Sequence, residues 1–158
     1  MPWSKALKIG VVSSSGGHTH EILAIRKYYE KYDCFYVTED ENQIDGLNNR
    51  IYVMDKIDRH EKHFLYHFIK LVIRAGKIMK EENPDVIIST GALVSYPFCV
   101  LAKLRGKRLI YIESKARIKT ASLTGRLVYP IADSFIVQWK SNLKKYSKAI
   151  YAGVDEKG

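Results

Sequence analysis

A loop of small and hydroxylated residues follows the first apolar segment of the chain. Residues 7–14 read as a buried strand, and Ser13-Ser14-Ser15-Gly16-Gly17-His18-Thr19 leads from it into a helical pattern over residues 18–32. Two glycines let the backbone adopt positive φ and approach a ligand closely, and the N–H groups at a helix start favour an anion. The loop therefore suits a diphosphate, although Gly-rich turns of this kind also occur in α/β proteins without a ligand.

The same loop matches neither of the two common nucleotide-binding signatures. No Gly-Lys-Ser or Gly-Lys-Thr follows it, so it is not a Walker A loop, and the third glycine of the dinucleotide fingerprint is missing. Glu39 or Asp40 would be only a chance match for the acidic residue that binds the ribose in that fingerprint.

Two further segments place chemistry-bearing residues after predicted strands. Ser89-Thr90-Gly91-Ala92-Leu93-Val94-Ser95-Tyr96-Pro97 again combines hydroxylated residues, a glycine and a helix start. Glu113-Ser114-Lys115-Ala116-Arg117 puts a carboxylate beside a serine and two cations, a set that can position a sugar hydroxyl and its phosphates together. An ion pair of Glu113 with Lys115 or Arg117 is the structural alternative.

Two histidines lie at the start of the first predicted helix. His18 is a candidate site residue at the end of the Gly-rich loop. A local hydrogen bond at the helix start is the alternative role for His18. We expect His20 to face solvent or to be structural rather than catalytic.

The elements that must position these residues alternate along the chain. Strands are expected at residues 7–14, 34–38, 50–55, 85–90, 108–113, 134–139 and 148–152, and helices at 18–32, 61–82, 97–105 and 122–132, with a polar loop at 39–49. Continuous apolar strands separated by helices predict a doubly wound parallel sheet, covered on both faces. Ligands bind such sheets outside the carboxyl ends of the strands, where the strand order reverses.

The length, composition and charge distribution of the chain limit the classes of protein to which it can belong. The 158 residues, 46% hydrophobic and 27% charged, fit one globular α/β domain over residues 1–158. Residues 1–100 carry 13 basic and 13 acidic side chains, whereas residues 101–151 carry 12 basic side chains against Glu113 and Asp133. The second half is therefore suited to an anion: a nucleotide, a lipid diphosphate, an anionic membrane or nucleic acid.

Several other classes of site are excluded by what the sequence lacks. Cys34 and Cys99 lie in apolar runs, which predicts buried free thiols, and no CxxC, HExxH or similar ligand spacing indicates a metal. The first residues lack the apolar core of a signal peptide, and no apolar run approaches the roughly 20 residues that span a bilayer. We therefore expect any membrane contact to be peripheral.

The long predicted helix at 61–82 carries a basic stripe. His63, His67, Lys70, Arg74 and Lys77 are spaced by three or four residues and so share one face. Aromatic and aliphatic residues between positions 64 and 72 supply a broad apolar face. One interpretation is a helix packed on the sheet with a solvated basic side, and a second adds contact with anionic lipid headgroups.

Four segments, in order and with matching separations, resemble one family. They are Ser14-Ser15-Gly16-Gly17-His18, Ser89-Thr90-Gly91-Ala92, Ile112-Glu113-Ser114-Lys115-Ala116-Arg117 and Ser122-Leu123-Thr124-Gly125-Arg126-Leu127. They look like the bacterial capsular and exopolysaccharide proteins of the PssD/CpsF type, relatives of Alg14, the membrane-recruiting subunit of a UDP-N-acetylglucosamine transferase. That family in turn resembles the N-terminal half of MurG, a two-domain GT-B glycosyltransferase.

The resemblance implies a split enzyme, of which this chain is the acceptor-binding half. A separate PssE/CpsG-like subunit would bind the UDP-sugar, this chain would bind no cofactor, and the complex would transfer the sugar with inversion to a lipid-diphosphate-linked sugar. His18 or Glu113 would be the general base. The chain would be inactive alone and would sit at the cytoplasmic face of the membrane. The residues implied at the acceptor diphosphate are Ser14, Ser15, Gly16, Gly17, His18, Thr19, Thr90, Gly91, Ser114 and Arg117.

The sequence departs from the family in two places. Ser114-Lys115 stands where MurG has a Gln-Asn pair, and the polar tail after Val154 differs from the usual apolar end. We also expect this chain to lack the N-terminal transmembrane anchor of the eukaryotic subunits. Two other functions fit the residues less well. A self-contained nucleotide-binding Rossmann enzyme lacks its fingerprint here, and nucleic-acid binding is not expected because the cations lie on no recognised nucleic-acid module.

Overall fold

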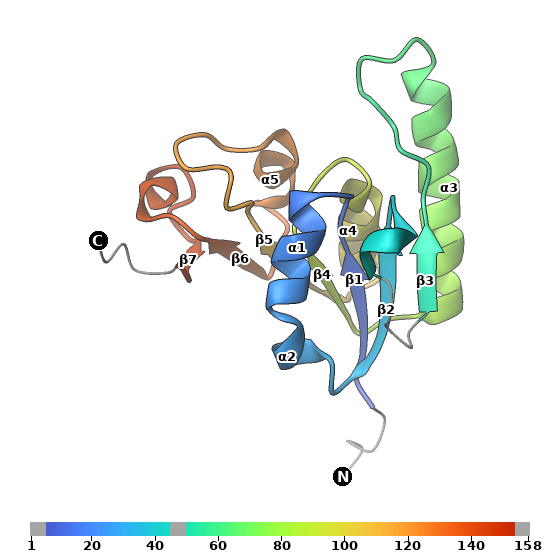
Figure 1. Cartoon of the computed structure of the whole chain (residues 1–158), viewed down its shortest axis with the longest axis horizontal. Coiled ribbons are helices and arrows are strands. Elements are labelled where there is room, and N and C mark those ends of the chain that lie inside the picture. Colours follow the sequence, from blue (N-terminus) through green and yellow to red (C-terminus); the bar gives the residue numbers. More distant parts are fainter. Residues whose placement is uncertain (1–5, 45–49, 154–158) are drawn as a thin grey trace.

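All seven predicted strands form one parallel sheet. The computed structural model describes residues 6–44 and 50–153, and the sheet order in it is β3-β2-β1-β4-β5-β6-β7 (Figure 1). The strands are β1 (Lys8–Val12), β2 (Asp33–Thr38), β3 (Arg50–Val53), β4 (Val86–Ser89), β5 (Arg108–Ile112), β6 (Ser134–Val137) and β7 (Ile150–Tyr151). The order reverses between β1 and β4, so the loops after these two strands lie side by side at the carboxyl edge of the sheet.

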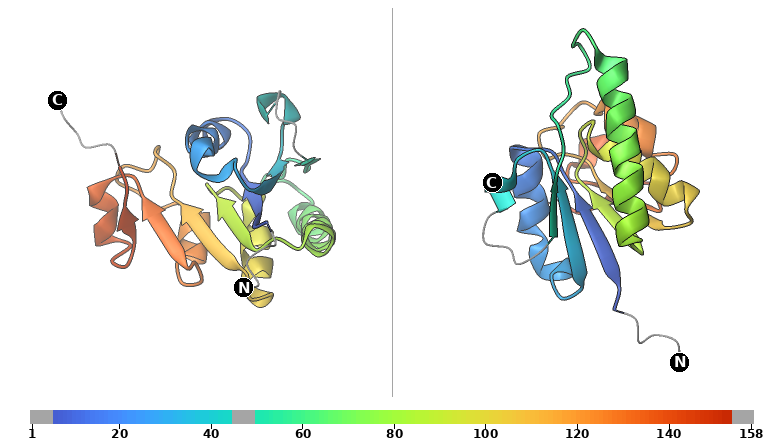
Figure 2. Two further views of the ribbon diagram at one scale, coloured as in Figure 1. Left: turned by 90° about the horizontal axis from the view of Figure 1, so that it is seen from below. Right: turned by 90° about the vertical axis from the view of Figure 1, so that its right-hand side faces the viewer.

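Helices cover both faces of the sheet (Figure 2). One face carries α1 (Gly17–Ala24) and α2 (Arg26–Tyr29), and the other carries α3 (Phe64–Glu82), α4 (Ser95–Leu104) and α5 (Leu123–Val128). Two 3₁₀ helices, η1 (Glu41–Ile44) and η2 (Lys140–Lys144), complete the elements. The described sheet and its two layers confirm the expected doubly wound α/β class.

Two of the predicted helices are shorter in the structure. The helix expected over residues 18–32 is interrupted at Ile25, whose φ of −101° and ψ of 9° are not helical. The helix expected over residues 122–132 is α5, which ends at Val128, because Pro130 has no N–H to continue it. The expected end of α3 before Pro84 is confirmed, and Asn83 there takes a left-handed φ of 44°. The polar loop at 39–49 contains η1, and its residues 45–49 lie outside the described part.

The sheet separates two apolar clusters, one under each layer of helices. Alternate residues of β2 face opposite sides, so Phe35 and Val37 pack in the cluster with α3 and α4, while Tyr36 packs in the one with α1 and α2. Cys34 and Cys99 are buried free thiols, as expected. Burial on both faces explains why these strands read as continuous apolar runs.

A buried carboxylate fixes α3 at the edge of the sheet opposite the loops. Glu82 is 4% exposed and accepts hydrogen bonds from Arg50 Nε (2.7 Å), Arg50 Nη2 (3.0 Å), Tyr52 Oη (2.7 Å) and Lys8 Nζ (3.3 Å). These donors come from β1 and β3, so the last turn of α3 is tied to two strands. Burial raises the pKa of Glu82, but the bonds from Arg50, Tyr52 and Lys8 outweigh it and hold the pKa below the usual value.

We expect Glu82→Gln to lower the free energy of unfolding by about 1–3 kcal/mol, because an amide accepts these bonds less well than a carboxylate. A carboxylate with a lowered folded-state pKa stabilises the protein above its unfolded pKa, and that contribution is lost as the pH falls through the folded value. The difference between wild type and variant should therefore be full at pH 7 and shrink below about pH 4.3. Urea unfolding at several pH values measures it. Glu81→Gln, at the exposed neighbour, is the control, and equal effects of both variants at pH 7 would contradict the role of Glu82.

Candidate functional site

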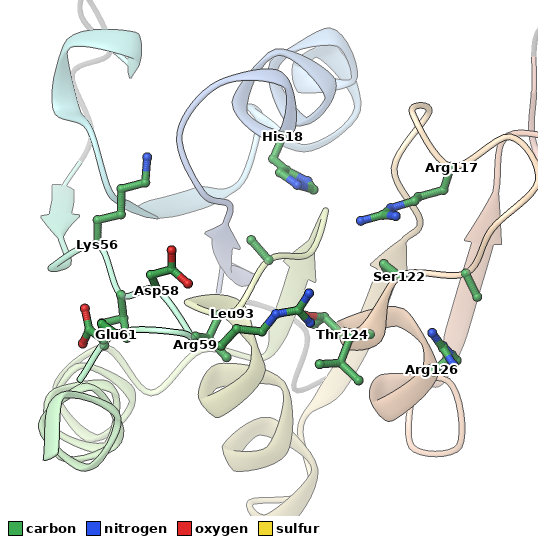
Figure 3. A pocket seen from close by; sticks show the side chains of 14 residues that line it. His18, Lys56, Asp58, Arg59, Glu61, Leu93, Arg117, Ser122, Thr124 and Arg126 are labelled. Atoms are coloured by element: carbon green, nitrogen blue, oxygen red, sulfur yellow. The ribbon is translucent and has the colours of Figure 1, made fainter. Parts of the chain in front are cut away.

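A cavity of about 670 Å³ opens at the carboxyl edge of the sheet (Figure 3). Segments that follow β1, β3, β4 and β5 all contribute to its wall, so it occupies the place where the reversed strand order predicts a ligand. The lining residues are His18, Lys56, Ile57, Asp58, Arg59, Glu61, Ala92, Leu93, Arg117, Ala121, Ser122, Leu123, Thr124 and Arg126.

The wall of the cavity is polar and net positive. Four cations, Lys56, Arg59, Arg117 and Arg126, stand against two carboxylates, Asp58 and Glu61. In Figure 3 the side chains of His18, Arg59 and Arg117 reach toward the middle of the cavity from three separate segments. Guanidinium groups bind phosphate oxygens bidentately, so this arrangement can hold a phosphorylated ligand.

His18 has a defined tautomer. Its Nδ1 lies 2.9 Å from the carbonyl oxygen of Thr90, which can only accept a hydrogen bond. Nδ1 therefore carries the hydrogen, and Nε2 of the neutral ring is left with a lone pair. Thr90 Oγ1 donates in return to the carbonyl oxygen of His18 at 3.0 Å. This pair of bonds fixes the imidazole across the strand-order reversal, with a proton acceptor available at the cavity.

The loop after β4 needs a glycine beside that histidine. Gly91 has a φ of +107°, and a Cβ added there would lie 2.6 Å from the Tyr111 hydroxyl and 3.7 Å from Cε1 of His18. Both Thr90 and Gly91 are buried and do not line the cavity, whereas the next two residues do. The loop thus frames His18.

Side-chain hydrogen bonds hold the conformation of the Gly-rich loop, residues 13–19. Thr19 Oγ1 donates to the carbonyl oxygen of Ser14 at 2.5 Å, and Ser15 Oγ lies 3.5 Å from Glu39. Gly16 takes a φ of +79°, and no heavy atom lies within 4 Å of a Cβ added to Gly16 or Gly17. None of these loop residues lines the cavity, but the space beside both glycines is open to a ligand that extends past His18.

Glu113 is buried at the end of β5, with 1% of its surface exposed. Its carboxylate accepts hydrogen bonds from Ser122 Oγ (2.6 Å), Ser122 N (3.2 Å), Tyr146 Oη (2.8 Å) and Ser114 N (3.3 Å). Burial and the bond to Glu113 raise the pKa of Tyr146, so its hydroxyl remains a donor. Ser122 also caps α5, as its Oγ accepts from Gly125 N at 2.9 Å. Glu113 thereby fixes the start of α5.

The described part of the structure does not contain the ion pair of Glu113 with Lys115 or Arg117 that was the alternative from the sequence. Among the ion pairs of the described residues, none joins Glu113 to Lys115 or Arg117, and all four of its bonds come from neutral donors. Glu113 is also absent from the cavity wall. Ser114 likewise points elsewhere and donates to Glu21 of α1 at 3.2 Å. Of the residues expected at the diphosphate, His18 and Arg117 are the ones that line the cavity.

The segment around η2 holds the loop that carries Arg117. Asn142 Nδ2 donates to the carbonyl oxygen of Arg117 at 2.6 Å, and Trp139 Nε1 donates to that of Lys115 at 2.7 Å. The carbonyl oxygens of Ile118 and Lys119 are bound by Ser141 and Lys145. Main-chain oxygens bound in this way orient the loop, and the loop in turn orients Arg117.

Several lining residues were not predicted from the sequence. The segment Lys56–Glu61 follows β3, and the rule that the carboxyl ends of parallel strands meet at one edge would have placed it at the site. Arg126 lies on α5, within the segment Ser122–Leu127 that resembles the family, but the sequence alone did not predict it at the site. No local sequence pattern indicates that the η2 segment holds the loop of Arg117, because its hydrogen-bond partners lie more than 20 residues earlier in the chain.

The basic stripe of α3 lies on the surface, as does part of its predicted apolar face. His63, His67, Lys70, Arg74 and Lys77 are all exposed. Leu71 is buried in the core, but the following apolar side chains are 37–69% exposed: Leu65, Tyr66, Ile69, Val72 and Ile73. The reason is that the N-terminal half of α3 projects beyond the sheet (Figure 1).

The described residues contain neither a metal-ligating cluster nor a membrane-spanning helix. Within residues 6–44 and 50–153, no group of three or more metal-ligating side chains could hold a metal ion. None of the described helices combines the length and apolar character needed to cross a membrane. Residues 1–5 and the polar tail after Val154 lie outside the described residues.

Comparison with known proteins identifies relatives of the whole chain. Residues 56–154 match the family described as "Oligosaccharide biosynthesis protein Alg14 like". The human UDP-N-acetylglucosamine transferase subunit ALG14 is 28% identical over 182 residues, which cover 94% of this chain and 83% of the human protein. The subunit of the same name from Debaryomyces hansenii is 33% identical over 155 residues, covering 90% of this chain and 62% of that protein.

A solved structure shows the same fold. The crystal structure of Acinetobacter baumannii MurG matches with a TM-score of 0.73 and 18% identity, over 85% of this chain and 42% of MurG. This chain thus spans less than half of that protein, and the likeness confirms the Rossmann-like fold expected from the sequence. The matched residues 56–154 include the segments after β3, β4 and β5 that line the cavity. The chain therefore belongs to the Alg14-like family of oligosaccharide biosynthesis proteins.

Proposed function

We propose that this chain is the acceptor-binding, membrane-associated subunit of a two-component glycosyltransferase. With a separate donor-binding subunit, it transfers a sugar from a UDP-sugar to a lipid-diphosphate-linked sugar in polysaccharide or glycan synthesis. The observation that carries the proposal is the net positive cavity that His18, Arg59 and Arg117 enter at the strand-order reversal. Membership in a family whose curated relatives are named as transferase subunits supports it.

The finer assignment follows the motifs of the sequence. We place the chain with the PssD/CpsF-type proteins of bacterial capsule and exopolysaccharide synthesis, with a PssE/CpsG-like partner that holds the UDP-sugar. The chain itself then needs no cofactor, and it acts at the cytoplasmic face of the membrane. Since one fold supports many activities, this assignment rests on the motifs and the cavity.

In this reaction a sugar hydroxyl of the acceptor attacks the donor, and its proton must be removed. We propose that Nε2 of His18 accepts the proton, because Nδ1 is held as a donor by Thr90. Arg59 and Arg117 bind the diphosphate and so place the hydroxyl near the imidazole. The leaving UDP is stabilised by the partner subunit.

We assign Glu113 a positioning role instead of the role of general base. Its buried carboxylate already accepts four hydrogen bonds and does not face the cavity, which supports a positioning role. Through Ser122 it holds the start of α5, whose Thr124 and Arg126 line the cavity. The Gly-rich loop, with Ser14, Ser15, Gly16, Gly17 and Thr19, frames the same site from the α1 side.

The projecting half of α3 is the proposed membrane contact. Its five exposed apolar side chains lie between residues 65 and 73, and the stripe of Lys70, Arg74 and Lys77 runs beside them and on along the same helix. Apolar side chains that enter the headgroup region and cations that meet anionic lipids are the two components of interfacial binding. Nucleic-acid binding receives less support, because the cations nearest the cavity converge with a histidine in a pocket of small-ligand size.

Transfer should require both subunits. We expect the purified chain to give no labelled lipid from radiolabelled UDP-N-acetylglucosamine and membranes that supply the acceptor, because the proposed UDP-sugar site lies on the separate subunit. Addition of the donor-binding subunit should restore labelling. Robust labelling by the isolated chain would overturn the two-component assignment.

His18→Ala should lower the turnover of the reconstituted complex by about 10²- to 10⁴-fold with a modest change in the KM for the acceptor, as for loss of a general base. His20→Ala is the matched control, since that neighbouring histidine is exposed and does not line the cavity. Steady-state kinetics with the purified lipid acceptor measure both. A Glu113→Gln variant that loses turnover at unchanged stability, beside an active His18→Ala, would instead assign the proton transfer to Glu113.

Replacement of Lys70, Arg74 and Lys77 by Gln should weaken binding to vesicles of anionic lipid by up to about 3 kcal/mol, or roughly 100-fold at low salt. The loss should shrink as salt is raised, since salt screens exposed charges. Vesicle sedimentation measures the binding. The control replaces Lys27, Lys31 and Lys148, which are exposed elsewhere, by Gln at the same change of net charge. Equal losses in both triple variants would show that the stripe is an ordinary solvated face.

A further inference from the structure

A second cavity lies between α3 and the segment that follows β3. Its volume is about 730 Å³, within the roughly 300–1,000 Å³ of sites that take small ligands. The apolar part of its wall consists of Met54, Ile57, Leu71 and Ile73. We call this cavity the α3 groove.

The α3 groove continues the cationic cavity. Lys56, Ile57 and Glu61 line both of them, so a single extended molecule can occupy the two spaces at once. Glu61 Oε1 lies 3.1 Å from His67 Nδ1, a contact that joins this shared wall to α3. The two cavities therefore adjoin along residues 56–61, and we call the two together the path; the wall of the α3 groove adds the core side chains of Met54 and Leu71.

The other end of the path reaches the surface proposed to contact the membrane. Ile73 lines the α3 groove and is 55% exposed, so it also belongs to the row of exposed apolar side chains on α3. Met54 and Leu71, by contrast, are 2% and 5% exposed. Both belong to the core, so the inner wall of the groove is formed by packed core side chains. Lys70, Arg74 and Lys77 also line the groove, so its surroundings are cationic.

This arrangement fits an amphiphile whose anionic head and hydrocarbon chain are joined directly. We propose that the α3 groove binds the first part of the hydrocarbon chain of the lipid diphosphate while the diphosphate lies in the cationic cavity. The inference rests on the proposed function, since it assigns the head of the same acceptor to the cavity of His18 and Arg117. The groove then selects acceptors by the chain next to the diphosphate, as each buried methylene is worth roughly fourfold in affinity.

Isoprenyl diphosphates of increasing length provide the test, because they carry no sugar. We expect the intact chain to bind farnesyl diphosphate at least about tenfold tighter than inorganic pyrophosphate in calorimetry, with geranyl diphosphate between them. Ile73→Asp should remove most of this gain and leave the affinity for pyrophosphate unchanged. Val72→Asp is the matched control, since Val72 is an exposed neighbour that does not line the groove. Circular dichroism checks that both variants fold.

A photoreactive group at the end of the farnesyl chain supplies a second readout. Labelling of peptides 54–57 or 70–77 supports the inference, and labelling elsewhere overturns it. Equal chain-length gains in Ile73→Asp and Val72→Asp also overturn it. If pyrophosphate and farnesyl diphosphate bind equally to the wild type, the groove inference fails while the proposed function stands. If neither binds, both fail.

Discussion

The bonds of one buried carboxylate fix much of the candidate site. Glu113 ends β5 below the surface and receives four hydrogen bonds, from its neighbour, from the cap of α5 and from Tyr146. The two oxygens of a carboxylate can accept several hydrogen bonds, and burying them costs free energy unless they are bonded in this way. The wall between residues 117 and 126, which supplies two arginines to the cavity, depends on this arrangement.

The fold could be predicted from local patterns because its central strands, such as β1, β2 and β4, are buried on both faces. Seven apolar runs marked the strands, and Pro84 marked the end of α3. The break at Ile25 has no such marker. The projection of α3 was not foreseen either, because helical periodicity reveals an apolar face but not how far the sheet beneath it extends.

The candidate site could be predicted only in part. His18 and Arg117 follow strands, and parallel strands bring such loops to one edge, so both reach the cavity. Glu113 also follows a strand, but its burial depends on Tyr146, 33 residues later, and on packing that no local pattern contains. Residues 56–61 follow the same rule as His18, yet their ordinary charged composition offered no motif.

The short segment between β3 and α3 connects the cavity with the proposed membrane contact. It contributes Lys56, Arg59 and Glu61 to the cavity, and its Glu61 contacts His67 on the helix that projects. Thermodynamic linkage is reciprocal, so whatever orders this segment from one side lowers the cost of ordering it from the other. Under the proposed function, a subunit that has bound its acceptor should therefore stay longer at the lipid surface, and one that has released its product should leave sooner.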